Sequence, residues 1–164
     1  MRPEPEPPGP GQESVWDYPR PPRLEATSSR VEVVLGGETV ARTTRALRVL
    51  ETSHPPTYYI PMADFVDGSL VPADGGSYCE WKGTAAYFDV HGGGMVAHRA
   101  AWHYPHPTTA FGQIAGHVAV YPAAMDRCVV DGEVARPQPG GFYGGWVTSR
   151  VVGPFKGGPG TRLW

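Results

Sequence analysis

Short runs of alternating apolar and polar residues, separated by glycine and proline, dominate this sequence. The clearest run lies at 30–35, where Arg-Val-Glu-Val-Val-Leu is rich in β-branched side chains. Gly36-Gly37 follows, and the pattern resumes at 38–41. Glycine tolerates the positive φ angles that tight hairpin turns need, so this stretch predicts a β-hairpin with a two-glycine turn.

Other short apolar runs predict further strands. They lie at 47–51, at 57–60, within 77–90 on both sides of Lys82-Gly83, at 95–97 and at 118–121. Helix is not expected through His54-Pro55-Pro56, because proline lacks an amide hydrogen and disfavours helix in the residue before it. One short helix is predicted at 109–117, where Thr109 can cap it and Phe111 and Ile114 follow helical spacing.

Many short strands with at most one modest helix indicate a mainly β fold and a single domain. Residues 1–13 form a proline-rich leader that we expect to be disordered, since too few apolar side chains are present to offset the cost of ordering. Residues 14–131 are expected to form the β-rich domain. Residues 132–164, rich in glycine and aromatic side chains, predict an extended arm that packs on the domain or on a neighbouring subunit.

Composition narrows the function classes. The chain of 164 residues can bury a core, and its formal charge of −2 argues against a surface that neutralises a nucleic-acid backbone. No apolar run approaches the roughly 20 residues needed to cross a bilayer, and no secretory signal is evident. Two cysteines, Cys79 and Cys128, are too few for a disulfide framework. We therefore expect a bacterial cytoplasmic protein that binds neither nucleic acid nor membrane.

Four blocks of mixed aromatic and charged residues stand out between about 30 and 130. They are Arg45–Glu51 with His54–Pro61 and Asp64, Cys79–Gly83 with Ala86-Tyr87, Ala101–Pro105, and Val118–Pro122. In order and spacing these blocks resemble the signatures of the family known as domain of unknown function 427.

The resemblance implies a fold of the β-tent type, in which small coiled antiparallel sheets meet at an angle. Similar domains often bind zinc through paired Cys-x-x-Cys motifs, or hold small ligands against aromatic residues. This chain has no such motif, so no structural metal and no other cofactor is expected.

The family has also carried a nucleotidyltransferase-like label. Gly68-Ser69 is followed by no Asp-x-Asp pair that would hold Mg²⁺ against a triphosphate, and the nearest carboxylates are Asp64 and Asp67.

The block around Cys79 is the first candidate site. In a continuous strand Cys79 and Trp81 would share one face and Lys82 would lie on the other. A nearby ammonium favours the reactive thiolate, whereas a buried cysteine serves as a small hydrophobic residue. Lys82 by itself suits an anionic ligand as a point charge, and the alternative is an exposed strand lysine.

Glu51, His54 and Arg45 form the second candidate site. A carboxylate, an imidazole and a guanidinium that converge in a cleft could perform acid–base chemistry, or they could form a structural network beneath the proline bend. We favour a structural role for Glu51 and ligand contact for His54.

Aromatic residues with polar tips could wall a site for a small ligand, with core packing as the alternative. The candidates are Tyr58, Tyr59, Trp81, Trp102 and Tyr104. Because strand alternation would bury only one of Tyr58 and Tyr59, at least one of them is expected outside the core.

Three histidines, His98, His103 and His106, raise the question of a metal site. No carboxylate accompanies them, and Pro105 and Pro107 break any helix that would align them, so no metal site is predicted.

Three functional hypotheses follow. The first is a binding domain that holds a small, anionic metabolite. Its predicted ligand contacts are Arg45, Glu51, His54, Tyr59, Trp81, Lys82, Trp102 and Tyr104. The second is an enzyme in which His54 is the acid–base residue and Cys79 or Lys82 is the nucleophile or anion clamp. The third is an interaction module that forms a homodimer through the C-terminal arm.

Overall fold

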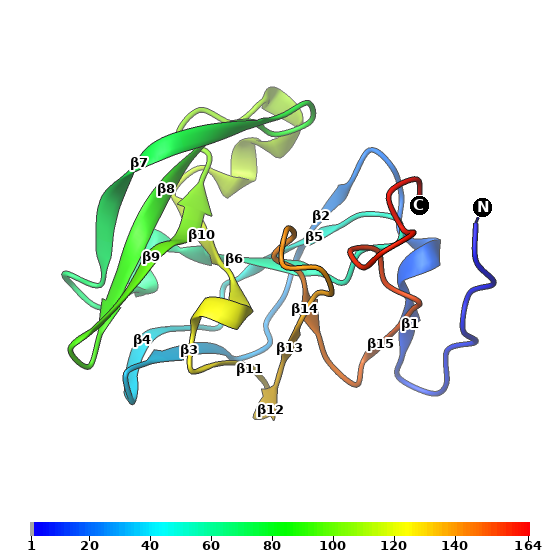
Figure 1. The fold of residues 1–164 in the computed structure, drawn as a ribbon, viewed down its shortest axis with the longest axis horizontal. Coiled ribbons are helices and arrows are strands. Elements are labelled where there is room, and N and C mark those ends of the chain that lie inside the picture. The colour runs from blue at the N-terminus through cyan, green and yellow to red at the C-terminus, as the bar shows by residue number, and fades with distance from the viewer. Residues whose placement is uncertain (1) are drawn as a thin grey trace.

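The structure, a computed structural model that describes residues 2–164, is mainly β. A large sheet and a smaller sheet face each other across a shared core, and the two ends of the chain lie near each other beside them (Figure 1). The mainly β architecture with antiparallel sheets, predicted from the many short strands, is confirmed.

The large sheet has seven strands, and each neighbouring pair is antiparallel. Its order is β2 (Arg23–Ala26), β5 (Leu47–Leu50), β6 (Thr57–Pro61), β10 (His117–Val120), β9 (Met95–His103), β8 (Gly83–Gly92) and β7 (Leu70–Cys79). The predicted strands at 47–51, 57–60 and 118–121 agree closely with β5, β6 and β10. β7 and β9 are longer than predicted, because each pairs with β8 over most of its length.

The smaller sheet has four strands and contains the predicted hairpin. Its order is β12 (Glu133–Val134), β11 (Arg127–Val130), β3 (Val31–Leu35) and β4 (Glu38–Thr43). Gly36 and Gly37, at the turn between β3 and β4, have φ angles of 60° and 76°, a region that other residues rarely adopt. The β-hairpin predicted from these two glycines is confirmed.

The helical elements within residues 2–164 are four short 3-10 segments. They are η1 (Val15–Asp17), η2 (Met62–Asp64), η3 (Thr109–Ile114) and η4 (Pro122–Ala124). The helix predicted at 109–117 is present as η3, although it is shorter than expected. Ala115, with a ψ of 134°, is already outside the helical region, Gly116 follows with a φ of 73°, and His117 belongs to β10.

Apolar side chains fill the space between the two sheets. Strands β3, β4 and β11 contribute from the small sheet, and β6, β8, β9 and β10 contribute from the large one. A second apolar cluster covers the opposite face of the large sheet. Tyr58 belongs to the first cluster and Tyr59 to the second, so both are buried. The expectation that one of them lies outside the core was wrong, because β6 is a central strand with both faces covered.

Two short strand pairs fasten the ends of the chain. β1 (Glu13–Ser14) pairs in parallel with β15 (Val151–Val152), and β13 (Arg136–Pro137) pairs with β14 (Trp146–Val147). Trp146 is fully buried in the core between the sheets, and its ring lies 4.8 Å from that of Tyr58. The C-terminal segment therefore contributes to the core of its own domain, while homodimer formation through it stays a prediction.

The proline-rich residues 2–12 lie along the C-terminal segment. The backbone N–H of Glu6 donates to the carbonyl of Gly153 over 2.9 Å, and Nε2 of Gln12 donates to the carbonyl of Ser149 over 2.8 Å. Met1 of the predicted leader lies outside the described residues. Disorder of residues 1–13 in solution stays a prediction.

Candidate functional site

A cleft of about 1030 Å³ opens on the face of the large sheet that carries Tyr59 and Trp102. Seven of the eight predicted ligand contacts line it, namely Glu51, His54, Tyr59, Trp81, Lys82, Trp102 and Tyr104, and so does the predicted nucleophile Cys79. Residues from separate sequence blocks thus meet around one space.

Arg45 is not part of this cleft. Its NH2 lies 2.9 Å from Oδ1 of Asp64, and 65% of its side chain is exposed. The hydroxyl of Thr43 donates to the other oxygen of Asp64 and accepts from the backbone N–H of Arg45. Thr43 and Arg45 therefore join the C-terminal end of β4 to η2, and the predicted convergence of Arg45 with Glu51 and His54 does not occur.

The turn between β5 and β6 brings Glu51 and His54 together. The backbone N–H of His54 donates to the carbonyl of Glu51 over 3.0 Å, so the two are the first and fourth residues of one β-turn. Ser53, the third residue, is buried and has a φ of 72°. Nε2 of His54 lies 3.4 Å from Oε2 of Glu51. The three-residue spacing in the sequence therefore becomes a side-chain contact.

Glu51 is a carboxylate among positive groups. NH2 of Arg20 lies 3.4 Å from its Oε2 and also donates to the carbonyl of Thr52 over 2.9 Å. Burial by itself raises the pKa of Glu51. The hydrogen bond from His54 and the charges of Lys82 and Arg20 outweigh that effect and hold the pKa below its usual value. Glu51 is thus a negative group at neutral pH.

Both ring nitrogens of His54 have partners. Nε2 faces Glu51, and Nδ1 lies 3.0 Å from Nε2 of Gln138, a buried residue of the C-terminal segment. Gln138 also accepts from the backbone N–H of Gly145 over 3.0 Å and donates to the carbonyl of Lys156 over 2.9 Å. Both ring nitrogens of His54 therefore face protein side chains.

Residues 80–82 form the turn between β7 and β8, and they do not continue a strand. β7 ends at Cys79 and β8 begins at Gly83, so the predicted alternation of Cys79 and Trp81 against Lys82 was wrong. Thr108 holds this turn, since its hydroxyl donates to the carbonyl of Trp81 and its backbone N–H donates to the carbonyl of Lys82. The turn lets Cys79, Trp81 and Lys82 all face the cleft.

Aromatic rings support Lys82 and form the walls. Nζ of Lys82 lies 5.8 Å from the ring centre of Tyr104 and 6.0 Å from that of Phe111, which are cation–π distances. Nε1 of Trp102 donates to the hydroxyl of Tyr59 over 3.3 Å. Burial raises the pKa of both Tyr59 and Tyr104, so both remain uncharged. The walls are therefore apolar surfaces with neutral hydroxyl groups.

The C-terminal segment supplies another side of the cleft, which sequence reasoning missed. It contributes Gln138, Gly141, Phe142, Tyr143, Gly144 and Lys156. The ring of Tyr143 packs edge-on against His54, with centroids 4.6 Å apart. A Cβ on Gly144 would lie 2.2 Å from Cη2 of Trp102, so only glycine permits this close approach. The aromatic residues among glycines in this segment were the available signal.

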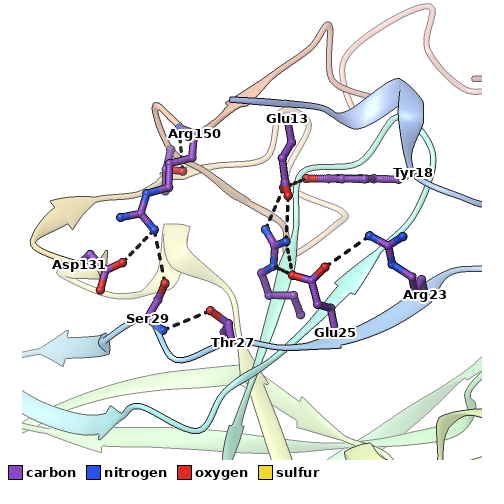
Figure 2. Close-up of polar contacts among 10 residues, drawn as sticks. Glu13, Tyr18, Arg23, Glu25, Thr27, Ser29, Asp131 and Arg150 are labelled. Carbon is purple, nitrogen blue, oxygen red and sulfur yellow. Dashed lines mark hydrogen bonds and ion pairs between the residues drawn. The ribbon is translucent and has the colours of Figure 1, made fainter. Parts of the chain in front are cut away.

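A polar network fixes the N-terminal segment that carries Arg20. Tyr18 donates to Glu13 over 2.7 Å, and Glu25 lies beneath them on β2 (Figure 2). Arg48 of β5, only 11% exposed, joins the two carboxylates: its NH1 lies 3.0 Å from Oε1 of Glu13 and its NH2 lies 2.5 Å from Oε1 of Glu25. This network holds the chain before Arg20 against the large sheet.

Two of the three histidines considered as metal ligands have other side-chain partners. His98 is exposed and lies 3.6 Å from Asp89, and the ring of His103 stacks on Phe88 with centroids 4.6 Å apart. Within residues 2–164 no three His, Cys, Asp or Glu side chains are grouped closely enough to hold a metal ion.

In the same part of the chain no helix has the length and apolar character needed to cross a membrane.

Comparison with known proteins gives one finding. The family model described as "Domain of unknown function (DUF427)" matches residues 23–131, about two thirds of the chain. No curated protein matches the sequence. The matched region includes Glu51, His54 and Lys82, whereas Gln138, Tyr143 and Lys156 follow it.

Proposed function

We propose that this chain, which belongs to the family described as "Domain of unknown function (DUF427)", binds a small anionic metabolite in the aromatic cleft. One observation carries this proposal. The sequence contains two lysines, Lys82 and Lys156, and both line the cleft. Lysine is ordinarily a residue of the open surface, so its confinement to one cleft favours a ligand with negative charge.

Lys82 is the better placed of the two lysines for an incoming anion. None of the ion pairs within residues 2–164 includes it. Lys156, by contrast, donates to the main-chain oxygen of Trp164 over 3.2 Å. The aromatic walls can hold a planar or apolar part of the ligand, and the volume of about 1030 Å³ suits a small molecule.

A thermal-shift screen of acidic metabolites tests the proposal. A ligand at 100 times its Kd stabilises the folded state by about 2.7 kcal/mol, which raises the melting temperature measurably. The variant Lys82→Met should abolish the shift, while Arg162→Met, which changes an exposed residue outside the cleft, should retain it. A hit that Lys82→Met leaves unchanged would place binding elsewhere, and a full library without a hit would count against a metabolite site.

The two lysines also permit direct mapping of a hit. Acylation of amines followed by mass spectrometry reports the reactivity of Lys82 and Lys156 separately. The ligand should slow acylation of Lys82 in proportion to its occupancy. Equal acylation rates with and without saturating ligand would contradict binding at this position.

An enzyme is the second candidate, because Cys79, Lys82 and the pair of Glu51 and His54 line the same space. This alternative predicts a reactive thiol at Cys79. Cys128 is fully buried, so iodoacetamide should modify Cys79 alone in the folded protein. A Cys79 that reacts more slowly than in the unfolded chain would remove the cysteine version of the enzyme hypothesis.

A further inference from the structure

We infer that Gln138 is a positioning residue that fixes His54 with its proton on Nε2. Glu51 then presents only a hydrogen-bond acceptor to the cleft. The ligand that fits this arrangement is a small planar acid that also carries a hydroxyl or amino donor. The role of Gln138 does not depend on the proposed function, whereas the ligand class rests on it.

The orientation of the Gln138 amide is fixed by two backbone groups. Oε1 accepts from the N–H of Gly145 over 3.0 Å, and Nε2 donates to the carbonyl of Lys156 over 2.9 Å. A flipped amide would set N–H₂ against an N–H and oxygen against a carbonyl oxygen, which loses both bonds. A Cβ on Gly145 would lie 2.5 Å from Oε1 of Gln138, so the backbone also encloses the amide closely.

This orientation determines which nitrogen of His54 carries the proton. The Gln138 atom that lies 3.0 Å from Nδ1 is Nε2, which has hydrogens and no lone pair to offer. Nδ1 must therefore be the acceptor and carry no proton. A neutral imidazole then has its single proton on Nε2, the nitrogen that faces Glu51 at 3.4 Å.

On the side away from the ligand, Oε2 of Glu51 consequently faces hydrogen-bond donors of the protein. Nε2–H of His54 and NH2 of Arg20 both approach Oε2 at 3.4 Å. No hydrogen bond within residues 2–164 uses Oε1, and this atom is not among the buried unpaired atoms, so it keeps contact with open space. Oε1 is thus a hydrogen-bond acceptor that a donor group of the ligand can satisfy. A matching ligand would place an anionic group at Lys82 and an O–H or N–H group at Oε1 of Glu51, and the aromatic walls favour a planar body between these two groups.

Long-range ¹H–¹⁵N correlation spectra at neutral pH test the role of Gln138 without any ligand. Six histidines are present, and the signals of His54 are those that disappear in His54→Gln. The expected result is a proton on Nε2 and a lone-pair acceptor at Nδ1. Gln138→Met removes the donor and should give a mixture of tautomers, while Gln113→Met, at an exposed glutamine, should leave the spectrum unchanged. A proton on Nδ1 in the unmodified protein would overturn the inference.

Binding of matched benzoic acids tests the ligand class. 4-Hydroxybenzoate has the donor, and 4-methoxybenzoate lacks it but keeps the anion and the ring. The hydroxy acid should bind about tenfold more tightly, because the methoxy acid leaves the acceptor unpaired. Glu51→Gln should bring this ratio toward one, whereas Lys82→Met should weaken both acids alike. Equal affinities would overturn the donor requirement. If neither acid binds, this ligand class is excluded, while the tautomer spectra still decide the role of Gln138.

Discussion

Gln138 and His54 are 84 positions apart in the sequence, yet Nε2 of Gln138 lies 3.0 Å from Nδ1 of His54. Both side chains are buried, and their contact joins the C-terminal segment to the turn between β5 and β6. The cleft is therefore complete only when residues after the family match fold over residues within it. Its properties should respond to changes on both sides of this junction.

Substitution of Ser53 should reveal backbone strain in the turn that carries Glu51 and His54. Ser53 has a φ of 72°, and its buried hydroxyl has no hydrogen-bond partner within residues 2–164. Ser53→Gly removes both unfavourable features and should keep the free energy of unfolding within about 1 kcal/mol. Ser53→Val places a β-branched side chain at positive φ and should cost about 2–3 kcal/mol. Urea unfolding measures both, and an unaltered stability of Ser53→Val would show that the turn is not constrained.

The stability of the protein should depend on the ionisation of Glu51. Its pKa in the folded state lies below the ordinary value of 4.5. Between these two values the unfolded chain binds more protons than the folded chain, so the free energy of unfolding falls as the pH drops below about 4.5. At higher pH the contribution is fully present.

Urea unfolding at a series of pH values measures this dependence. Glu51→Gln should give a shallower loss of stability below pH 4.5 than the unmodified protein. Glu4→Gln, at an exposed glutamate, serves as the control and should leave the slope unchanged. Identical slopes for Glu51→Gln and the unmodified protein would show that Glu51 is not stabilised as the anion.

Gly144→Ala should disturb the cleft by moving Trp102. A Cβ at position 144 would lie 2.2 Å from Cη2 of that indole. The resulting overpacking should cost about 1–3 kcal/mol in unfolding free energy and change the tryptophan fluorescence. Gly158→Ala is the matched control in the same segment, because its Cβ would meet no atom of the described residues within 4 Å. If both variants behave alike, the contact between Gly144 and Trp102 is not tight in solution.

Arg48 should matter more for stability than the other arginines of its region. Arg48→Met leaves Glu13 and Glu25 without their shared guanidinium and should cost about 2–3 kcal/mol. Arg48→Lys should recover part of this loss, since an ammonium keeps the charge but not the forked geometry. Arg42→Met removes an exposed pair with Glu32 and should cost about 0–1 kcal/mol. Thermal unfolding compares the three variants.

The local pattern of residues in the sequence was sufficient to predict several features of this protein. The β-hairpin at Gly36-Gly37 and the strands on either side of His54 follow from neighbouring residues, because alternation and turn chemistry act within a few positions of the chain. The contact of Glu51 with His54 was foreseeable for the same reason, since both belong to one four-residue turn.

Tertiary structure decided the burial of the other site residues and their place in the cleft, because both depend on which distant segments cover a given face of the sheet. Tyr58 and Tyr59 are both buried because β6 has clusters on both sides, which alternation within β6 does not reveal. Arg45 is directed to Asp64 by the packing of η2, although it belongs to the same signature block as Glu51. Gln138 and Lys156 reach the cleft because Trp146 anchors their segment in the core. The sequence determined which residue types were available for a site, and long-range packing decided which of them share one cleft.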